Sequence, residues 1–233
     1  MSGLAATLRL DVQVQARSQL YGIGIGVAVA VGLIARFLVG AEHAAVGAPI
    51  LYLLALGGTT YIFGASMVLV ENSQGTLAAL RVSPLRRDTY FLSKLITLTA
   101  FAAVEGAIIH AVGFWGTGFS LLPLGAGVLG LGLFNTLVGL AHVASHDSMF
   151  SFLVPGAMLI GSILQWPFLY ALDIGPPWVW YLFPTQGPLL LMLGAFEPLA
   201  AWQWGYALAM TVGSTLAVGW LARRRFAEHV GLL

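Results

Sequence analysis

Six long apolar runs, separated by short polar stretches, are the feature that most constrains this chain. A helix needs about 20 mostly apolar residues to cross the hydrocarbon core of a bilayer. Only 8% of the 233 residues are charged, against roughly 25% in an ordinary soluble domain. The runs are continuous rather than alternating, which favours helices over the strands of a β-barrel. The sequence therefore predicts an all-α integral membrane protein with six transmembrane helices, at about residues 20–39, 48–70, 90–113, 120–143, 149–172 and 202–222.

Six spans with short connections leave no room for a sizeable soluble domain, so we expect one transmembrane domain over residues 1–233. The chain has no cysteine, which excludes disulfides, thiolate metal sites and cysteine nucleophiles. The first 18 residues lack the charged, apolar and cleavage-site order of a secretory signal. We therefore expect the first span to be an uncleaved anchor.

The basic residues predict an orientation, because Lys and Arg near span ends favour the cytoplasmic side. With six spans, nine of the ten basic residues fall on one side and only Arg36 falls on the other. The opposite side collects Glu42, Asp173 and Glu197. Both termini are thus expected in the cytoplasm, in a multi-pass protein of the cell membrane.

Two further segments are not expected to cross the membrane. Within residues 1–18, positions 8–17 alternate apolar and polar residues, which by pattern alone predicts a strand. No cytoplasmic segment is free to pair with such a strand, so we favour a helix on the membrane surface. Residues 176–198 are apolar but are interrupted by Pro184 and Pro188. They predict short interfacial or re-entrant helices on the outer side, before the last span.

Residues 71–88 form a basic, proline-containing connection between the second and third apolar runs. The pattern from 71 to 82 is compatible with a short helix, with Asn72 or Ser73 as its N-cap. Ser83 followed by Pro84 is a strong signal for the start of the next helix. A polar, basic loop is also what topology alone requires. The apolar pair Leu77 and Leu80, three residues apart on one side of such a helix, and the stiff turn at Ser83-Pro84 favour docking to a partner.

The stretch from 71 to 96 resembles the signature loop of permeases of ABC exporters of the second exporter type. That loop has an acidic residue after the second span, a Gly-Thr-Leu, a Ser/Thr-Pro-Leu, and then an aromatic residue and a lysine entering the third span. The span order and the short helices before the last span are also similar, so the resemblance covers essentially the whole chain. Within that group the chain is similar to small drug-export permeases, including those for fluoroquinolones. The matching residues are Glu71, Gly75, Thr76, Leu77, Ser83, Pro84, Leu85, Tyr90 and Lys94.

The resemblance implies that residues 71–88 form a coupling helix that sits in a cleft of a separate ABC ATPase subunit. Residues 1–18 would flank the same interface. A second permease, either an identical copy or a sibling chain, would complete the pore, with membrane lipid around it and no nucleic acid. The residues expected to dock the ATPase are Glu71, Gly75, Thr76, Leu77, Leu80, Arg81, Ser83, Pro84, Leu85, Arg86 and Arg87.

The chain itself is not expected to be an enzyme. A P-loop needs Gly-x-x-x-x-Gly-Lys-Ser/Thr, and the only lysine is Lys94, preceded by Ser93 and followed by Leu95. The glycines of 22–26 lack the third glycine of a dinucleotide loop and are more typical of close helix packing. ATP and Mg²⁺ would belong to the partner, and this chain would hold no cofactor.

Ionisable and strongly polar residues inside spans are costly and are therefore candidates for a substrate pathway. Glu105 lies well inside the third span, with His110 five residues beyond. The carboxylate could attract cationic amphiphiles or carry a proton, or it could be a structural group bonded to a neighbouring helix. Asn135 and Gln165 are further candidates, which hydrogen bonding between helices would also explain.

His142 and His146 lie four residues apart, with Asp147 adjacent, a spacing that could bind a metal. The glutamate of an HExxH motif and a second histidine pair are both missing, so we expect no metal site.

Two hypotheses for function follow. The first is the permease subunit of an ATP-driven exporter that moves hydrophobic or amphipathic compounds, such as drugs, out of the cytoplasm or the inner leaflet. The second is an ATP-independent protein, either a carrier that couples protons through Glu105 or a non-transporting assembly factor. Such carriers often contain inverted repeats, which are not evident between residues 1–113 and 114–233.

Overall fold

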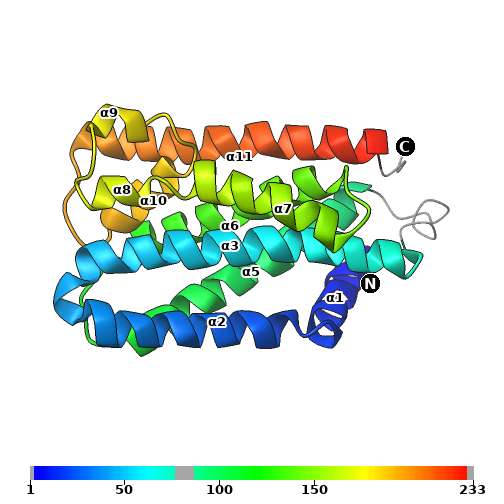
Figure 1. Ribbon diagram of the computed structural model, residues 1–233, viewed down its shortest axis with the longest axis horizontal. Coiled ribbons are helices and arrows are strands. Elements are labelled where there is room, and N and C mark those ends of the chain that lie inside the picture. Colours follow the sequence, from blue (N-terminus) through cyan, green and yellow to red (C-terminus); the bar gives the residue numbers. More distant parts are fainter. Residues whose placement is uncertain (1–2, 77–86, 230–233) are drawn as a thin grey trace.

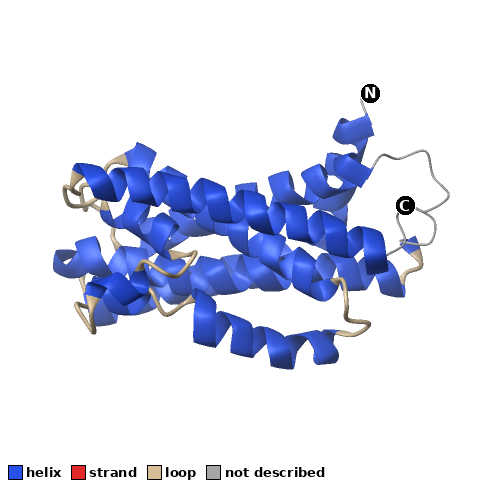
Figure 2. Cartoon of the chain, turned by 90° about the horizontal axis from the view of Figure 1, so that it is seen from above, coloured by secondary structure: helices blue, strands red, loops and turns tan. Residues whose placement is uncertain are grey.

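The computed structural model describes residues 3–76 and 87–229, and in these ranges every regular element is a helix (Figures 1 and 2). Four single helices are long: α3 (Ala44–Ser73), α5 (Arg87–Gly113), α6 (Leu121–Val143) and α11 (Ala201–His229). Another long run joins α2 (Leu20–Ile34) to a π-helical turn (Ala35–Val39). The shorter elements are α1 (Gly3–Arg17), a 3₁₀ turn (Ala41–His43), α7 (Met149–Leu159) with a π-helical turn (Ile160–Leu164), α8 (Phe168–Ala171), α9 (Pro177–Trp180) and α10 (Gln186–Leu193).

Within the described residues, five helical segments are long and apolar enough to cross a membrane. They coincide with five of the six expected spans, because a continuous apolar run in lipid must satisfy its backbone within one helix. They are Leu20–Val39, Ala41–Ser73, Asp88–Gly113, Leu121–Val143 and Ala201–Ala227.

The sixth expected span, 149–172, has a different structure. Its α-helical part ends at Leu159, a π-helical turn follows to Leu164, and Pro155 lies inside the helix. Those 16 residues would rise only about 24 Å as a helix, which is shorter than a hydrocarbon core of about 30 Å. The crossing of the membrane at this position therefore stays a prediction.

The first and last described helices, α1 and α11, place the two ends of the described chain at the same end of the bundle (Figure 1), which we call the terminal end. Figure 1 shows α1 and the C-terminal part of α11 there, together with the end of α3 that leads into 77–86. The chain leaves α6 at this end and, through α7, reaches α8 and α9 at the opposite end (Figure 1). The described part of the chain therefore begins and ends at the same end of the bundle (Figure 1), and the number of membrane crossings stays a prediction.

The N-terminal segment is helical, as expected, but its buried side is polar. Thr7, Asp11 and Gln15, spaced four apart and so on one side of the helix, are buried, whereas Leu10 and Val12 are exposed. The helix packs against α5 and α2. An amphipathic surface helix would rest on its apolar side, so the bundle, rather than lipid alone, determines which side of α1 is covered.

The two short helices expected in 176–198 are α9 and α10, at the end opposite the termini (Figure 1). The side chains from Gln186 to Met192 in α10 are all buried, and α10 packs between α6 and α11. An added Cβ at Gly127 of α6 would lie 2.8 Å from the Pro188 carbonyl oxygen. The backbones of α6 and α10 therefore lie in close contact, and α10 is part of the helix bundle.

The crossing of α3 and α6 forms the centre of the molecule. Gly64 of α3 faces the backbone of Thr136, and Gly139 of α6 faces the backbone of Tyr61. With no Cβ at either position, the two backbones approach closely, as in small-residue contacts of membrane helices. The aromatic ring of Phe152 from α7 stacks on Tyr61, with 5.1 Å between ring centroids.

Candidate functional site

The start of the 71–88 segment continues the preceding helix. Glu71, Asn72 and Ser73 form the last turn of α3, and Ser73 Oγ donates to the Val70 carbonyl at 2.8 Å instead of capping a new helix. Gly75 then adopts a φ of +71°, the left-handed conformation that commonly ends helices. The expected helix starting at 71 is therefore wrong in its first residues, because Gly75 terminates α3.

The centre of the segment, residues 77–86, lies outside the described residues. This range includes seven of the expected docking residues: Leu77, Leu80, Arg81, Ser83, Pro84, Leu85 and Arg86. Of the other four, Glu71 lies in the last turn of α3, Gly75 and Thr76 follow that helix, and Arg87 is the first residue of α5. Docking of an ATPase at these positions stays a prediction.

A buried ion cluster lies where α1, α3 and α5 meet. Lys94 of α5 donates through Nζ to Glu71 Oε1 at 2.5 Å and to Asp11 Oδ1 at 3.1 Å. The exposed fractions are 0% for Lys94, 2% for Asp11 and 5% for Glu71. The remaining carboxylate oxygens accept from hydroxyls, with Tyr90 donating to Glu71 Oε2 and Ser93 donating to Asp11 Oδ2, each at 2.5 Å. All four carboxylate oxygens of the cluster therefore have a partner.

The polar contacts continue along α1. Gln15 donates through Nε2 to Thr97 Oγ1 at 2.8 Å and to Met67 Sδ at 3.1 Å. Its Oε1 accepts from the Tyr21 hydroxyl at 2.6 Å. Hydrogen bonds thus join α1 to α2, α3 and α5 within two turns of the ion cluster.

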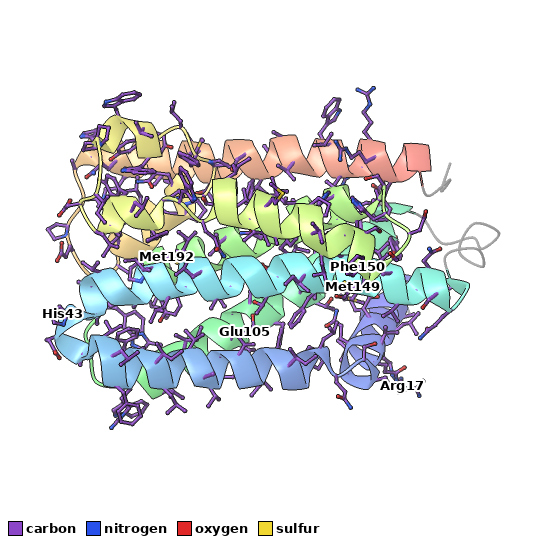
Figure 3. All side chains as sticks on the ribbon, viewed as in Figure 1. Arg17, His43, Glu105, Met149, Phe150 and Met192 are labelled. Carbon is purple, nitrogen blue, oxygen red and sulfur yellow. The ribbon has the colours of Figure 1, made fainter. Side chains whose placement is uncertain are left out.

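Glu105 lies between α2, α3 and α5 in the middle of the bundle (Figure 3). It is 1% exposed, and Oε2 accepts from Thr59 of α3 at 2.9 Å. Its Oε1 points at Gly24 of α2, where an added Cβ would lie 2.5 Å away. Oε1 has no hydrogen-bond partner among the described residues. One carboxylate oxygen therefore bonds a neighbouring helix, and the other is buried without a hydrogen-bond partner among the described residues.

His110 lies five residues, about 1.4 turns, farther along α5, beside a cavity of about 370 Å³ between α5 and α6. Its Nδ1 is 3.0 Å from the Tyr52 hydroxyl, and its ring meets Phe119 edge-on at 4.3 Å between centroids. The other lining residues are apolar or glycine and include Trp115. This cavity could accept an apolar or aromatic group of a ligand.

Asn135 and Gln165 bond to backbone carbonyls. Asn135 Nδ2 donates to Leu131 of its own helix, and Gln165 Nε2 donates to Leu54 of α3, both at 3.0 Å. Asn135 also lies beside Gly57 of α3, and Gln165 lies beside the next residue.

Three of the four expected pathway residues thus meet consecutive residues of α3. Asn135 faces Gly57 and Gln165 faces Gly58. Glu105 accepts a hydrogen bond from Thr59, the next residue of α3. Successive helix residues point about 100° apart. The three side chains therefore meet α3 on different sides and are not gathered at one point in this conformation.

The histidine pair bonds and packs within the protein. The Tyr61 hydroxyl and His142 Nδ1 form a short hydrogen bond, and the rings of His142 and His146 meet edge-on. His146 Nδ1 is 2.9 Å from the His142 carbonyl. Within 3–76 and 87–229, no group of three or more His, Asp or Glu side chains could hold a metal ion.

Sequence reasoning missed Asp11, Ser93 and Gln15 as partners in the ion cluster and its extension. The resemblance had singled out Glu71, Tyr90 and Lys94 by position only. A usable signal was present in the N-terminal segment, because Thr7, Asp11 and Gln15 recur every four residues and define a polar face. What that face contacts could not be read from its spacing.

The chain matches known proteins over most of its length. The model of the fluoroquinolones export permease protein family matches residues 2–231. Two relatives are fluoroquinolones export permease proteins of Mycobacterium tuberculosis, from strains CDC 1551 / Oshkosh and ATCC 25618 / H37Rv. Each is 32% identical to the chain over 176 residues, which cover 73% of this chain and 72% of the relative. No solved structure matches the chain.

Proposed function

Since the chain belongs to the fluoroquinolones export permease family, we propose that it is the membrane subunit of an ATP-driven exporter. It moves hydrophobic or amphipathic compounds, fluoroquinolone-like drugs among them, out of the cytoplasm or the inner leaflet of the cell membrane. The family match over nearly the whole chain is the observation that carries this proposal.

ATP hydrolysis belongs to a separate ABC ATPase that docks on 71–88. Support comes from the position of this connection, which leaves α3 and enters α5 at the terminal end of the bundle (Figure 1). The basic residues of α1 and the Arg223–Arg225 run of α11 belong to the same end. By the positive-inside rule that end is cytoplasmic, where a soluble ATPase can reach it.

A second permease completes the transport pathway. In favour of this is the exposure of α7, which buries only Phe152 and Gly156 within the chain. Its outward side chains, such as Phe150 and Met158, are largely exposed, and Figure 3 shows Phe150 near the start of the helix. A pathway between two copies or sibling chains would place this side of the bundle against the partner or lipid.

Docking is tested with the double variant Leu77→Asp/Leu80→Asp. We expect recovery of the complex with an ATPase from the same genome to fall at least about tenfold, or ~1.4 kcal/mol, because charge replaces the apolar pair. Co-purification measures this, with Ser145→Asp as the control for an added charge in an exposed connection at the same end. Undiminished complex formation by correctly inserted protein would contradict docking at this segment.

The energy source is tested separately, in proteoliposomes that hold the permease and the ATPase. We expect fluoroquinolone transport with ATP and Mg²⁺ and none with a proton gradient alone. Transport driven by the gradient without the ATPase would instead support the proton-coupled carrier.

Glu105 is proposed to act on cationic substrates through Oε1, which bonds to no side chain or backbone group within 3–76 and 87–229. The variant Glu105→Gln retains the size of the side chain and an oxygen that can accept from Thr59. We expect export of cationic compounds to fall roughly tenfold, equivalent to about 1.4 kcal/mol, while neutral compounds of similar size are exported as before. Uptake into inside-out vesicles across a panel of such pairs measures this. An equal loss for both classes would assign Glu105 to packing alone.

A further inference from the structure

The ion cluster joins the two ends of the 71–88 connection to a third element. Glu71 lies in the last turn of α3, before the connection, and Lys94 lies in the second turn of α5, after it. Asp11 of α1 reaches the same ammonium group. Lys94 is the only lysine of the chain, and it also lies 4.2 Å from the centroid of the Tyr90 ring.

The described ends of the connection, in α3 and α5, cannot separate without disturbing this cluster. If the ends of α3 and α5 separated, Glu71 would part from both Lys94 and Tyr90. If α5 moved relative to α1, Asp11 would part from both Lys94 and Ser93. Each motion would leave a buried charge without its partner, which is strongly unfavourable. The low-energy motion is one in which α1 and the adjoining ends of α3 and α5 move together.

We propose that Asp11, Glu71 and Lys94 form a rigid connection between helices, which we call the joint. The joint makes α1 and the ends of α3 and α5 one rigid unit, so that a push on 71–88 moves all three. The inference rests on the proposed function for the source of that push, which is the partner ATPase. Asp11, Glu71 and Lys94 are positioning residues in this scheme, and none of them needs to touch the substrate.

The first measurement uses the permease alone and does not depend on an ATPase. Because the chain has no cysteine, spin labels can be placed uniquely at Gln13→Cys on α1 and Leu92→Cys on α5, both exposed positions. We expect one narrow distance between the labels in the parent protein. In the Asp11→Ala variant we expect the distribution of label distances to broaden. In the control variant Arg9→Ala, at an exposed position of the same helix, we expect it to stay narrow. An unchanged distance with Asp11→Ala would overturn the proposal.

The second measurement makes the joint reversible. Ser93 Oγ and Asp11 Oδ2 are 2.5 Å apart, so the variant Asp11→Cys/Ser93→Cys puts one thiol on each side of this contact and leaves Lys94 paired with Glu71. A mild oxidant or a short thiol cross-linker closes the joint in purified complexes, and reduction opens the disulfide again. Failure of the two thiols to cross-link would contradict the contact itself.

With the joint closed, we expect the amount of drug exported per ATP hydrolysed to match that of the unsubstituted complex. With the joint open, this ratio should fall roughly tenfold while ATP hydrolysis continues, and reoxidation should restore it in the same sample. A purely structural role predicts equal export in both states, and that result would overturn the proposal. The unsubstituted complex under the same redox treatment is the control. If it shows no ATP-dependent export, the proposed function fails, and the spin-label distances still decide whether the joint exists.

Discussion

Replacing Lys94 with methionine is expected to lower the free energy of unfolding by about 3–5 kcal/mol, as for other buried ion pairs that lose one partner. The variant keeps an apolar side chain of similar length but leaves Asp11 and Glu71 buried without the ammonium group that both contact. Two carboxylates share one lysine, so this is the most damaging single neutralisation in the cluster. Equilibrium unfolding of the purified protein in detergent measures the loss.

Matched variants separate uncompensated charge from simple loss of contacts. Asp11→Asn leaves Lys94 paired one to one with Glu71, so its cost should be smaller, about 1–3 kcal/mol. The triple variant Asp11→Asn/Glu71→Gln/Lys94→Met has no charge in the cluster and should recover much of the loss of the single variant. Arg9→Met, at an exposed position of α1, should stay within about 0.5 kcal/mol of the parent. A triple variant less stable than Lys94→Met alone would contradict this account.

Gly139→Ala is expected to lower the free energy of unfolding by about 1–3 kcal/mol, the usual cost of overpacking a core. The added Cβ would overlap the carbonyl oxygen of Tyr61 and lie 3.1 Å from its carbonyl carbon. Backbone atoms cannot rotate away as a side chain can, so α6 must shift relative to α3. Such a shift would also displace the hydrogen bond between Tyr61 and His142.

The control for this substitution lies in the same helix. Gly125 has no atom within 4 Å of an added Cβ, and alanine is favoured over glycine in helices by about 1 kcal/mol. Gly125→Ala should therefore leave stability unchanged or raise it. The series is completed by Gly139→Leu, which we expect to reduce the yield of folded protein further. Equal stabilities for the alanine variants at 125 and 139 would contradict the close crossing of α3 and α6.

The long helices could be predicted from the sequence because lipid-sized apolar runs need no tertiary information to become helical. The expected ends at 113 and 143 coincide with the ends of α5 and α6. Predictions failed where two local signals competed. At 71–75, residues suited to an N-cap continue α3, and Gly75 ends it. In 149–172, apolar residues predicted a helix of span length, but the continuous helical part ends with the π-helical turn at Leu164, so the crossing there stays a prediction.

The candidate site was predictable only in part. The resemblance drew attention to Glu71 and Lys94, and hydropathy singled out Glu105 as a charge inside a span. The sequence could not pair these residues, since the partner of each lies on another helix. Asp11 is 83 positions away from Lys94, and the side of α1 that is buried is its polar side.

The amino-acid sequence by itself determined that this protein is helical and built for a membrane, and at which ends of its helices the basic residues lie. These properties follow from local composition, because a backbone in hydrocarbon must satisfy its own hydrogen bonds within each segment. Only the tertiary structure decided that α1 docks through a polar face, that one lysine holds two carboxylates, and that one oxygen of Glu105 has no partner in the part of the chain that the structure describes. Those outcomes depend on how closely helices approach and at what rotation, which is set by small residues such as Gly24 and Gly139 at the crossings.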